Sequence, residues 1–392
     1  MKVIHIITRL IVGGAQENTL LNCRDLITQY GDDVTLVIGP EAGPEGSLLE
    51  QARDWGIPIE VVDSLRRAIH PTRDRLAYQA LRRLIRQRRP DVVHTHSAKG
   101  GMLGRFAAHA ERVPAIVHTV HGAPFHPYQG RGARWFFARC ERAAAARCHR
   151  LISVADAMTE LLVAAGVAPR EKFSTIYSGM EVKPFLAADA LRSAQRAELG
   201  YRDEHVVIGK IARLFHLKGH DDFLAAAEQV AAENPQVRFL LVGDGLWRES
   251  IEARIRRSIL RDRVWITGLV PPGEIPAWLA AMDVVVHTSL REGLARVLPQ
   301  ALLAGRPVIS FDVDGAREVV ASDETGILLP PRDVAGLAAA MRRLAADPAM
   351  RARLAAEGRR RCTERFRHDN MTRQIRELYE ATLEAGGVRC EV

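Results

Sequence analysis

Short apolar runs rich in β-branched residues alternate with longer stretches of helical periodicity along the whole chain. Such runs predict parallel strands buried on both faces, and their alternation with helices predicts βαβ units. The predicted strands of the first half are Val3–Ile7, Val34–Ile38, Ile59–Val62, Val92–His94, Ile116–Val120 and Leu151–Val154. Those of the second half are Val206–Ile211, Arg238–Val242, Val264–Ile266, Val284–His287 and Val308–Ser310. Two such series predict an α/β fold of two Rossmann-like domains with doubly wound parallel sheets.

The domain boundary is expected where the pattern changes, near residues 183–200. We therefore predict an N-terminal domain over residues 1–185 and a C-terminal domain over residues 186–365. A chain of 392 residues is long enough for two domains that each bury a core. The final run, residues 370–383, has the periodicity of a helix.

Composition and charge narrow the class of protein. Hydrophobic content of 47% and charged content of 26% are ordinary for a globular chain. A net charge of +8 favours an anionic partner, such as a nucleotide sugar, a phospholipid surface or nucleic acid. Nucleic acid is the weakest of these, because the arginines are dispersed and neither a zinc-finger spacing nor an RNP aromatic motif is present. The five cysteines form no C-x2-C pair, which argues against zinc and a disulfide framework and fits a reducing cytoplasm.

Membrane insertion is not predicted. His5 and Arg9 interrupt the apolar N-terminus where a signal peptide needs a continuous apolar core. No run of 18 apolar residues occurs, so a transmembrane helix is not expected and any membrane contact would be peripheral.

The segment from Arg291 to Ile309 carries the strongest functional signal. Glu292 follows an apolar strand, a glycine comes next, and an amphipathic run ends at Ala-Gly-x-Pro-Val. This order predicts strand, loop, helix, glycine stop and strand. Gln300 lies eight positions after Glu292, so we expect both near the start of one helix, where backbone N–H groups can bind a diphosphate.

Two cations, Arg213 and Lys218, follow the predicted strand Val206–Ile211. Ligands of α/β proteins bind at this edge of the sheet, and two fixed cations suit a leaving diphosphate whose charge grows as its bond breaks. The alternative is a pair of solvated surface cations.

Glycine turns follow other predicted strands. Gly13 and Gly14 open a helix, where the backbone can approach an anion and the helix N-terminus favours negative charge. The segment lacks the G-x-G-x-x-G spacing, so a dinucleotide site is not supported, and an ordinary glycine turn is the alternative. Gly243 lies in a Gly-Asp-Gly turn that could equally be a simple β-turn.

Histidines cluster after two strands, in His94-Thr95-His96 and in His118-Thr119-Val120-His121. Paired histidines suggest a metal, but no carboxylate or cysteine stands near either pair, so we predict none. Asp312-Val313-Asp314 lies between a strand and a helix, which predicts turn and N-cap chemistry.

The stretch Arg131–Arg150 predicts an amphipathic helix. At 100° per residue Phe137, Cys140, Ala144 and Cys148 share one face. A basic, tryptophan-bearing opposite face would suit anionic lipid headgroups, with a solvated helix as the alternative. Its members are Arg131, Arg134, Trp135, Arg139 and Arg142.

The segment from Arg291 to Ile309 closely resembles the donor-site signature of retaining GT-B glycosyltransferases of the glycosyltransferase 4 type, also called glycosyl transferases group 1. Their pattern is Glu-x7-Glu, and Gln300 takes the second position here. The resemblance covers nearly the whole chain. It implies two domains facing each other across a cleft, with the acceptor on the N-terminal and the nucleotide sugar on the C-terminal domain. Residues 366–392 would pack back on the N-terminal domain.

The resemblance also implies residue roles. Glu292 would meet the donor-sugar hydroxyls, with Gly293 and Leu294 as backbone donors, and Gln300 would face the ribose diol through an amide. His121 would lie at the reacting centre, so that His121 and Glu292 are the catalytic residues. The other donor-binding residues would be Gly13, Gly14, Arg213, Lys218, Gly243 and Val270, and His96 and Lys99 would line the acceptor side.

The implied activity is that of a metal-independent, hexosyltransferase-like enzyme without cofactors. It would move a sugar with retention from a nucleoside diphosphate sugar, UDP-sugar favoured, to a glycan or lipid-linked acceptor in polysaccharide or glycoconjugate assembly. The expected location is the cytoplasm, including the inner face of the membrane. The alternatives are a non-catalytic nucleotide-sugar binder and a sugar-nucleotide epimerase or phosphorylase on the same fold.

Overall fold

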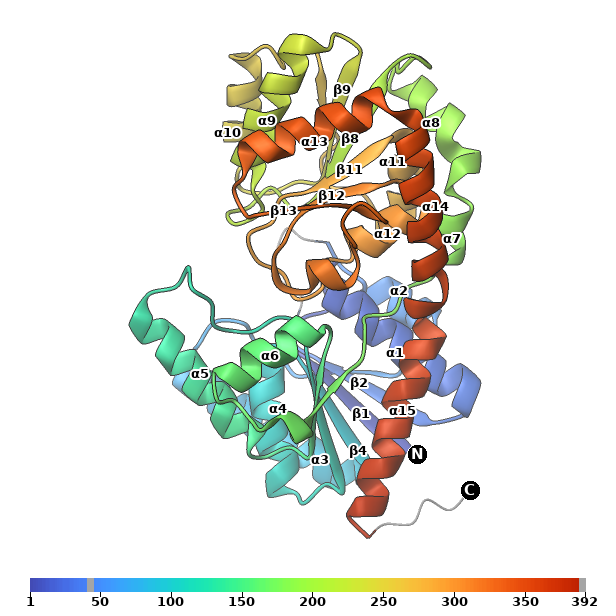
Figure 1. Ribbon diagram of the computed structural model, residues 1–392. Coiled ribbons are helices and arrows are strands. Elements are labelled where there is room, and N and C mark those ends of the chain that lie inside the picture. The colour runs from blue at the N-terminus through green and yellow to red at the C-terminus, as the bar shows by residue number, and fades with distance from the viewer. Residues whose placement is uncertain (41–45, 388–392) are drawn as a thin grey trace. The chain divides into compact units, whose positions relative to one another are not determined.

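The computed structural model describes residues 1–40 and 46–387, which fold into two compact units (Figure 1). Unit 1 comprises Met1–Met180 and the segment from Arg367 onward. Unit 2 comprises Glu181–Phe366. The chain thus leaves unit 1 after Met180, five residues before the predicted boundary after residue 185.

Unit 1 is built on a seven-stranded parallel sheet of order β3-β2-β1-β4-β5-β6-β7. The order reverses between β1 and β4, which makes their carboxyl ends the topological switch point where α/β sheets bind ligands. The strands are β1 Lys2–Ile7, β2 Asp33–Ile38, β3 Ile59–Val61, β4 Val92–His96, β5 Ala115–Val120, β6 Arg150–Ser153 and β7 Phe173–Thr175.

Helices cover both faces of this sheet (Figure 1). On one face α15 packs on α1, and the buried side chains of α1, α2 and α15 join one apolar core with the strands. On the other face α4 packs between α3 and α5. The helices are α1 Gly14–Tyr30, α2 Leu49–Asp54, α3 Pro71–Arg88, α4 Ala98–Ala110, α5 Arg131–Ala145, α6 Asp156–Ala164, the 3₁₀ turn η1 Arg170–Lys172, and α15 His368–Ala385.

The last helix belongs to unit 1 although it follows unit 2 in sequence. Asp25 of α1 accepts hydrogen bonds from His368 at 2.6 Å and Thr372 at 3.0 Å. The hydroxyl of Tyr379, fully buried on the same helix, lies 2.5 Å from Nδ1 of His94. These polar contacts and the apolar face of α15 fix its register on the sheet.

Unit 2 repeats the plan with a six-stranded parallel sheet of order β10-β9-β8-β11-β12-β13. Its order reverses between β8 and β11, which places the switch point at their carboxyl ends. The strands are β8 Val206–Ile211, β9 Val237–Val242, β10 Val264–Ile266, β11 Val284–His287, β12 Val308–Phe311 and β13 Gly326–Leu329.

The helices of unit 2 also form two layers (Figure 1). α9 packs with α13 on one side, whereas α8 with α11 and α12 with α14 form the other. Asp333 and Asp347 cap α13 and α14 by accepting 2.8 Å hydrogen bonds from N3 backbone amides, which explains where these helices start. The elements are α7 Lys183–Leu186, η2 Ala188–Leu191, α8 Arg192–Glu198, α9 His220–Glu233, α10 Arg248–Arg256, η3 Pro272–Glu274, α11 Ile275–Ala281, α12 Val297–Leu303, η4 Asp314–Glu318, α13 Val334–Ala346 and α14 Pro348–Arg365.

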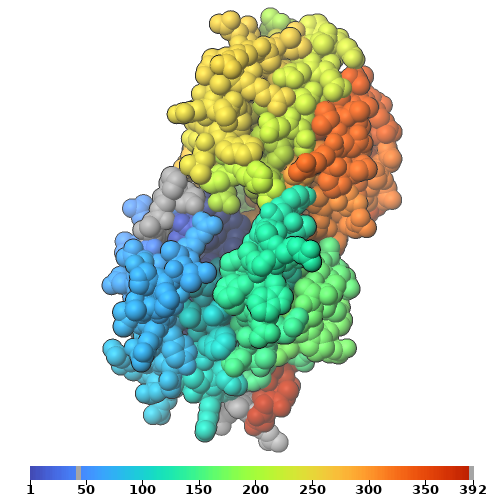
Figure 2. Space-filling view, turned by 90° about the vertical axis from the view of Figure 1, so that its left-hand side faces the viewer, coloured from blue at the N-terminus to red at the C-terminus, as the bar shows by residue number. Residues whose placement is uncertain are grey.

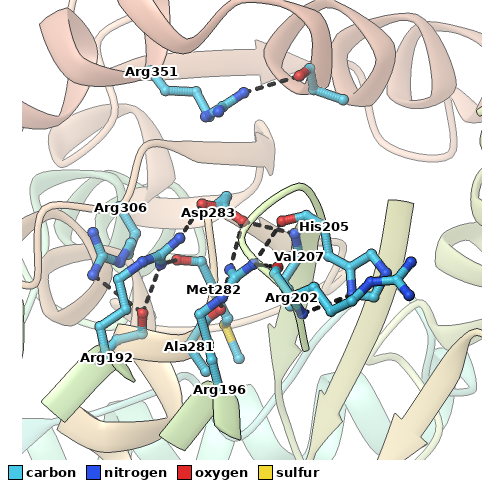
Figure 3. Close-up of polar contacts among 12 residues, drawn as sticks. Arg192, Arg196, Arg202, His205, Val207, Ala281, Met282, Asp283, Arg306 and Arg351 are labelled. Atoms are coloured by element: carbon cyan, nitrogen blue, oxygen red, sulfur yellow. Dashed lines mark hydrogen bonds and ion pairs between the residues drawn. The ribbon is translucent and has the colours of Figure 1, made fainter. Parts of the chain in front are cut away.

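A buried charge network ties α8 to the sheet of unit 2 (Figure 3). The Asp283 carboxylate pairs with Arg192 at 2.6 Å and Arg196 at 3.1 Å, and it accepts the backbone N–H of Val207 at 2.8 Å. Arg196 also donates to the carbonyl of His205 at 2.7 Å. A largely buried carboxylate is stable here because two guanidinium groups and a backbone N–H donate to it.

The predicted fold class is confirmed, and all eleven predicted strands are present with ends shifted by at most two residues. The two edge strands β7 and β13 were not predicted from the sequence. Each is short, and neither is a continuous β-branched run, because β7 reads Phe-Ser-Thr and β13 begins at a glycine.

Candidate active site

The switch point of unit 2 is occupied by an ion pair. Lys218 lies in the loop after β8 and Glu292 in the loop after β11, and these two strands are hydrogen-bonded neighbours. The Lys218 ammonium contacts the Glu292 carboxylate, and the two side chains are 20% and 23% exposed. The sequence prediction that both residues lie at a ligand-binding edge of the sheet therefore agrees with their position, and the structure adds that they touch.

Neighbouring groups hold Glu292 in its ionised form. Nε2 of His287 lies 3.7 Å from the carboxylate, and Asp314 accepts the backbone N–H of Glu292 at 2.6 Å. Burial alone would raise the pKa of Glu292, but the Lys218 charge and the His287 ring outweigh it, so the pKa lies well below its usual range. A permanent carboxylate can accept hydrogen bonds from hydroxyl groups.

The expected helix position of Glu292 was wrong. The helix α12 begins only at Val297, so Glu292 lies in the preceding loop, whereas Gln300 lies within the helix. The carbonyl of Gly293 in that loop accepts the N–H of Gly315 at 3.3 Å. The loop is therefore fixed by η4 rather than by a helix start.

A buried lysine supports the loop that carries Lys218. Lys210 of β8 is 1% exposed, and its Nζ donates to Oγ1 of Thr288 at 2.8 Å. The same hydroxyl donates to the carbonyl of Gly219 at 2.7 Å. Gly219 has φ +66°, and a Cβ there would lie 1.9 Å from the Thr288 carbonyl oxygen, so only glycine fits this approach. Burial and the nearby Lys218 charge lower the pKa of Lys210 to about 7.

Arg213 stands on the same loop with its side chain exposed to solvent. Its guanidinium lies over the ring of Phe215 at 5.2 Å, and its carbonyl is 2.9 Å from Nε2 of His220. Gly243 packs against this loop so closely that a Cβ would lie 2.2 Å from the Ala212 carbonyl. Gly243 thus has a clear structural role in shaping the Arg213 loop.

The remaining predicted donor residues lie in two different units. In unit 2, Leu294 is buried, while Val270 and Gln300 are partly buried. In unit 1, Gly13 precedes and Gly14 begins α1, at the end of the loop that follows β1. Their roles toward a nucleotide sugar stay predictions.

The switch point of unit 1 holds a row of histidines from neighbouring strands. Nδ1 of His5 lies 3.0 Å from Nε2 of His96, and Nδ1 of His96 lies 3.1 Å from Nε2 of His121. His94 sits beside them, with its Nε2 2.7 Å from the Thr119 hydroxyl. Burial lowers the pKa of His94 and His96 well below the ordinary value, and that of His5 to about 3, so these rings are neutral.

His5, His94 and His96 also bring ring nitrogens within 4.8 Å of one another, a spacing that a metal ion could use. Yet five of their six ring nitrogens already have hydrogen-bond partners, and only His5 Nε2 has none among the described residues. A metal would have to displace several of these bonds. The predicted absence of a metal remains a prediction.

The two predicted acceptor-side residues have different surroundings. His96 contacts His121, the predicted catalytic residue of this unit. Lys99 instead donates to both carboxylate oxygens of Asp74, at 2.7 and 2.9 Å, and to the carbonyl of Ala68 at 2.5 Å. Lys99 could therefore meet an acceptor only if this ion pair opened.

All five residues of the predicted basic face of α5 are exposed. Trp135 is 63% exposed, and Arg139 lies over its ring at 5.2 Å. Arg131 and Arg134 are exposed as well. Arg142 is different, because it donates to the carbonyls of Gly166 at 2.6 Å and Ala165 at 3.1 Å at the end of α6. No helix in the described ranges is long and apolar enough to span a membrane.

The buried side of α5 differs from the predicted apolar stripe. Ala144 and Cys148 are buried, but Phe137 and Cys140 are only partly so. Glu141 is buried between them and pairs at 2.8 Å with Arg105, a fully buried arginine of α4. A charged pair at a helix contact is not visible in a pattern of apolar positions.

Several site residues were missed by sequence reasoning. Asp314 was expected to provide turn or N-cap chemistry, but its carboxylate holds the Glu292 loop. Lys210 and His5 lie inside strands, where polar residues carried no motif. Lys210 and His5 could have been recognised as candidates because each is a polar residue within a predicted buried strand.

Two Rossmann-like units, each with a polar site at its switch point, are the architecture of the GT-B class of glycosyltransferases. The model "Glycosyl transferases group 1" matches residues 192–361, and the model "Glycosyl transferase 4-like domain" matches residues 13–179. A D-inositol 3-phosphate glycosyltransferase of Xylanimonas cellulosilytica is 30% identical over 303 residues, covering 74% of this chain and 71% of that protein. The chain belongs to the glycosyl transferases group 1 family of the glycosyltransferase 4 type.

Other relatives cover more of the chain. A UDP-Gal:alpha-D-GlcNAc-diphosphoundecaprenol alpha-1,3-galactosyltransferase of Escherichia coli is 28% identical over 88% of both chains. The crystal structure of Anabaena HepE in complex with UDP has a TM-score of 0.82 and 24% identity, covering 97% of this chain and all of that one. Sucrose-phosphate synthase of Thermosynechococcus elongatus has a TM-score of 0.80 and 21% identity, covering 98% of this chain and 100% of that one. The two solved structures establish the fold.

We predict that Lys210→Met changes the pH dependence of the stability of unit 2. Between pH 7 and about 10.4 the unfolded chain holds the lysine proton and the folded chain does not, so this group makes stability rise with pH. Its contribution is at most about 1.4 kcal/mol per pH unit. The free energy of unfolding of Lys210→Met relative to wild type should therefore fall as pH rises from 7 to 9.

Urea unfolding at several pH values measures this difference. Lys183→Met, which removes an exposed lysine of the same unit, is the matched control and should give a difference that does not change with pH. A pH-independent difference for Lys210→Met as well would show that Lys210 keeps its proton in the folded state.

Proposed function

We propose that the protein transfers a sugar from a nucleoside diphosphate sugar, with a UDP-sugar favoured, to a glycan or lipid-linked acceptor. The observation that carries this proposal is the set formed by Lys218, Glu292 and Asp314 at the switch point of unit 2. Membership of the glycosyltransferase family and the galactosyltransferase of Escherichia coli, whose name specifies a UDP-sugar and a diphosphoundecaprenol acceptor, support it.

In this proposal unit 2 binds the donor. Arg213 is exposed on a loop that His220 and Gly243 hold in place, so its guanidinium can reach a diphosphate without rearranging the backbone. Arg213 and Lys218 would stabilise the charge that develops on the leaving diphosphate. Glu292, held ionised, would accept hydrogen bonds from the sugar hydroxyls, and Gln300 would meet the ribose.

Unit 1 would bind the acceptor and supply His121. We propose that transfer proceeds with retention, without a metal and without a covalent intermediate, by attack on the same face from which the diphosphate leaves. Glycan or lipid-linked products of this kind would place the enzyme in polysaccharide or glycoconjugate assembly in the cytoplasm, including the inner face of the membrane.

Product analysis tests the reaction. The purified protein should convert an undecaprenyl diphosphate-linked GlcNAc and UDP-galactose or UDP-glucose into an extended glycan, detected by mass spectrometry. Proton NMR of the product should show the α-anomer, which means retention from an α-linked donor. A donor that is bound but left unchanged would instead support a binder, an epimerised donor an epimerase and a sugar phosphate a phosphorylase, and a β-linked product would rule out retention.

We predict that Arg213→Ala weakens UDP binding by about 1.5–3 kcal/mol, the contribution of a hydrogen bond to a charged group. The UDP affinity of Arg213→Lys should lie between those of Arg213→Ala and wild type, because lysine keeps the charge but lacks the planar guanidinium. Calorimetric titration with UDP and GDP measures both. The control is Arg257→Ala, which removes an exposed arginine at the C-terminal end of α10, at the opposite edge of the sheet. Unchanged affinity in a folded Arg213→Ala protein would exclude Arg213 from the nucleotide site.

We also propose peripheral binding of anionic membrane through the first turns of α5, which lie at the surface that faces the viewer in Figure 2. Beside Trp135, Phe136 is 48% exposed and Tyr128, in the preceding loop, 45%. Exposed aromatic rings among Arg131, Arg134 and Arg139 suit the interface between headgroups and acyl chains. Arg142 is left out of this surface because it caps α6.

The triple variant Arg131→Ser/Arg134→Ser/Arg139→Ser should lose sedimentation with anionic vesicles, since each cation near such a surface contributes roughly 1 kcal/mol. Wild type should sediment with anionic but not neutral vesicles and be released by salt. A triple variant of equal charge loss, Arg67→Ser/Arg75→Ser/Arg83→Ser, removes exposed arginines in and before α3 and should still bind. Equal loss in both triples would indicate net charge rather than a docking surface.

A further inference from the structure

The three histidines His5, His96 and His121 form a continuous hydrogen-bonded row at the switch point of unit 1. An imidazole N–H and an imidazole lone pair each lie in the plane of their own ring, so a good bond between two rings needs the N···N line to run near both ring planes. The His5 and His96 rings are 13° apart in orientation with centroids at 5.3 Å, and those of His96 and His121 are 29° apart at 5.4 Å. The geometry therefore favours two genuine N–H···N bonds, at 3.0 and 3.1 Å.

Neutral rings leave only two arrangements of hydrogens in this row, because each ring then carries one N–H and one lone pair. In the first, His5 Nδ1–H donates to His96 Nε2, and His96 Nδ1–H donates to His121 Nε2. In the second, every bond is reversed, so that His121 Nε2–H donates to His96 and His96 Nε2–H donates to His5. The hydrogen of one ring thus fixes those of the others.

The surroundings of His5, at the buried end of the row, favour the first of these two hydrogen arrangements. His5 Nε2 is buried and has no partner among the residues the structure describes, and the His5 ring is fully buried in β1. The reversed arrangement would put a hydrogen on this atom and leave a buried donor unpaired, which is rare and costly in proteins. The first arrangement leaves only a lone pair there.

His94 packs beside the row but makes no hydrogen bond to its rings. Its Nδ1 lies 2.5 Å from the Tyr379 hydroxyl and its Nε2 2.7 Å from the Thr119 hydroxyl, and its ring centroid is 4.2 Å from that of His96. The fully buried Tyr379 comes from α15, so the last helix of the chain restrains the ring beside His96. The His96 ring is thus held by bonds at both nitrogens and by packing.

We propose that His5 and His96 are positioning residues that fix the orientation and the tautomer of His121, with its Nε2 accepting from His96 and its hydrogen on Nδ1. His121 then acts as a hydrogen-bond donor through Nδ1. The role of this donor in catalysis rests on the proposed transferase function, whereas the assignment of the tautomer does not.

The tautomer is measured directly by two-bond 1H–15N NMR correlation of histidine rings in the ¹⁵N-histidine-labelled full chain. The signals of His121 are identified by their loss in His121→Gln. We expect a protonated Nδ1 and an unprotonated Nε2 at His121 in wild type. A hydrogen on Nε2, a charged ring, or shifts of the His5 and His96 signals on adding Zn²⁺ would overturn the proposal.

Two near-isosteric variants separate positioning from bulk. The amide nitrogen of Asn lies near the place of histidine Nδ1, so His96→Asn keeps the donor toward His121. The Gln amide lies near the place of Nε2, so His96→Gln keeps the contact with His5 and loses the one with His121. His96→Gln should lower kcat by up to ~10²-fold, as misplacement of a reacting group does, with little change in donor KM. His96→Asn should retain most of kcat.

The NMR measurement and the kinetic measurement distinguish failure of this proposal from failure of the proposed function. If the tautomer is as expected but no transfer occurs with any sugar nucleotide, the row stands and the proposed function fails. If transfer occurs and His96→Gln is as active as His96→Asn, or both variants lose stability and activity equally, the role of His96 is merely structural and the proposal is wrong.

Discussion

A parallel sheet covered by helices on both faces leaves its carboxyl edge as the natural place for polar chemistry, and both units of this protein follow that constraint. The strands are apolar because both faces are buried, and the connecting loops at that edge carry the functional groups. The two strands at the switch point are neighbours in the sheet although far apart in sequence, so residues on them and on the loops that follow them approach one another. Lys218 meets Glu292 in unit 2, and His5 meets His96 in unit 1.

Burial makes the partners of each charge as important as the charge itself. The Glu292 carboxylate stays ionised because Lys218 and His287 lie beside it, although its surroundings exclude much of the solvent. Lys210 has a hydroxyl but no carboxylate at contact distance among the described residues. Burial therefore destabilises its charged form, and its pKa falls. The same rule explains why Asp283 collects two arginines and why Arg105 has Glu141. Each of these pairs joins two elements, so the charges also fix how the helices and strands meet.

The fold and part of the site could be predicted from the sequence because they depend on local patterns. Apolar runs mark strands whatever lies around them, and Glu292 and Lys218 lie in the loops that follow such runs. Contacts between distant segments could not be predicted in the same way. Nothing local shows that Asp314 turns its carboxylate toward the Glu292 backbone, or that the exposed Arg142 donates to carbonyls at the end of α6. The row of histidines required the order of the strands, since β1 and β4 are neighbours in the sheet but almost ninety residues apart.

The two switch points solve the problem of orienting a polar group in different ways. Unit 2 uses opposite charges, which bind strongly but need compensating partners and respond to any ion that enters the site. Unit 1 uses neutral rings, which can be buried completely because each nitrogen needs only one hydrogen-bond partner. In a row of such rings the hydrogen position of one ring determines that of the next, without any net charge. Reversing one hydrogen bond reverses them all and leaves an unpaired N–H at His5 Nε2. A group that must present one fixed donor is better held by a neutral row, and a group that must meet a diphosphate is better held by charge.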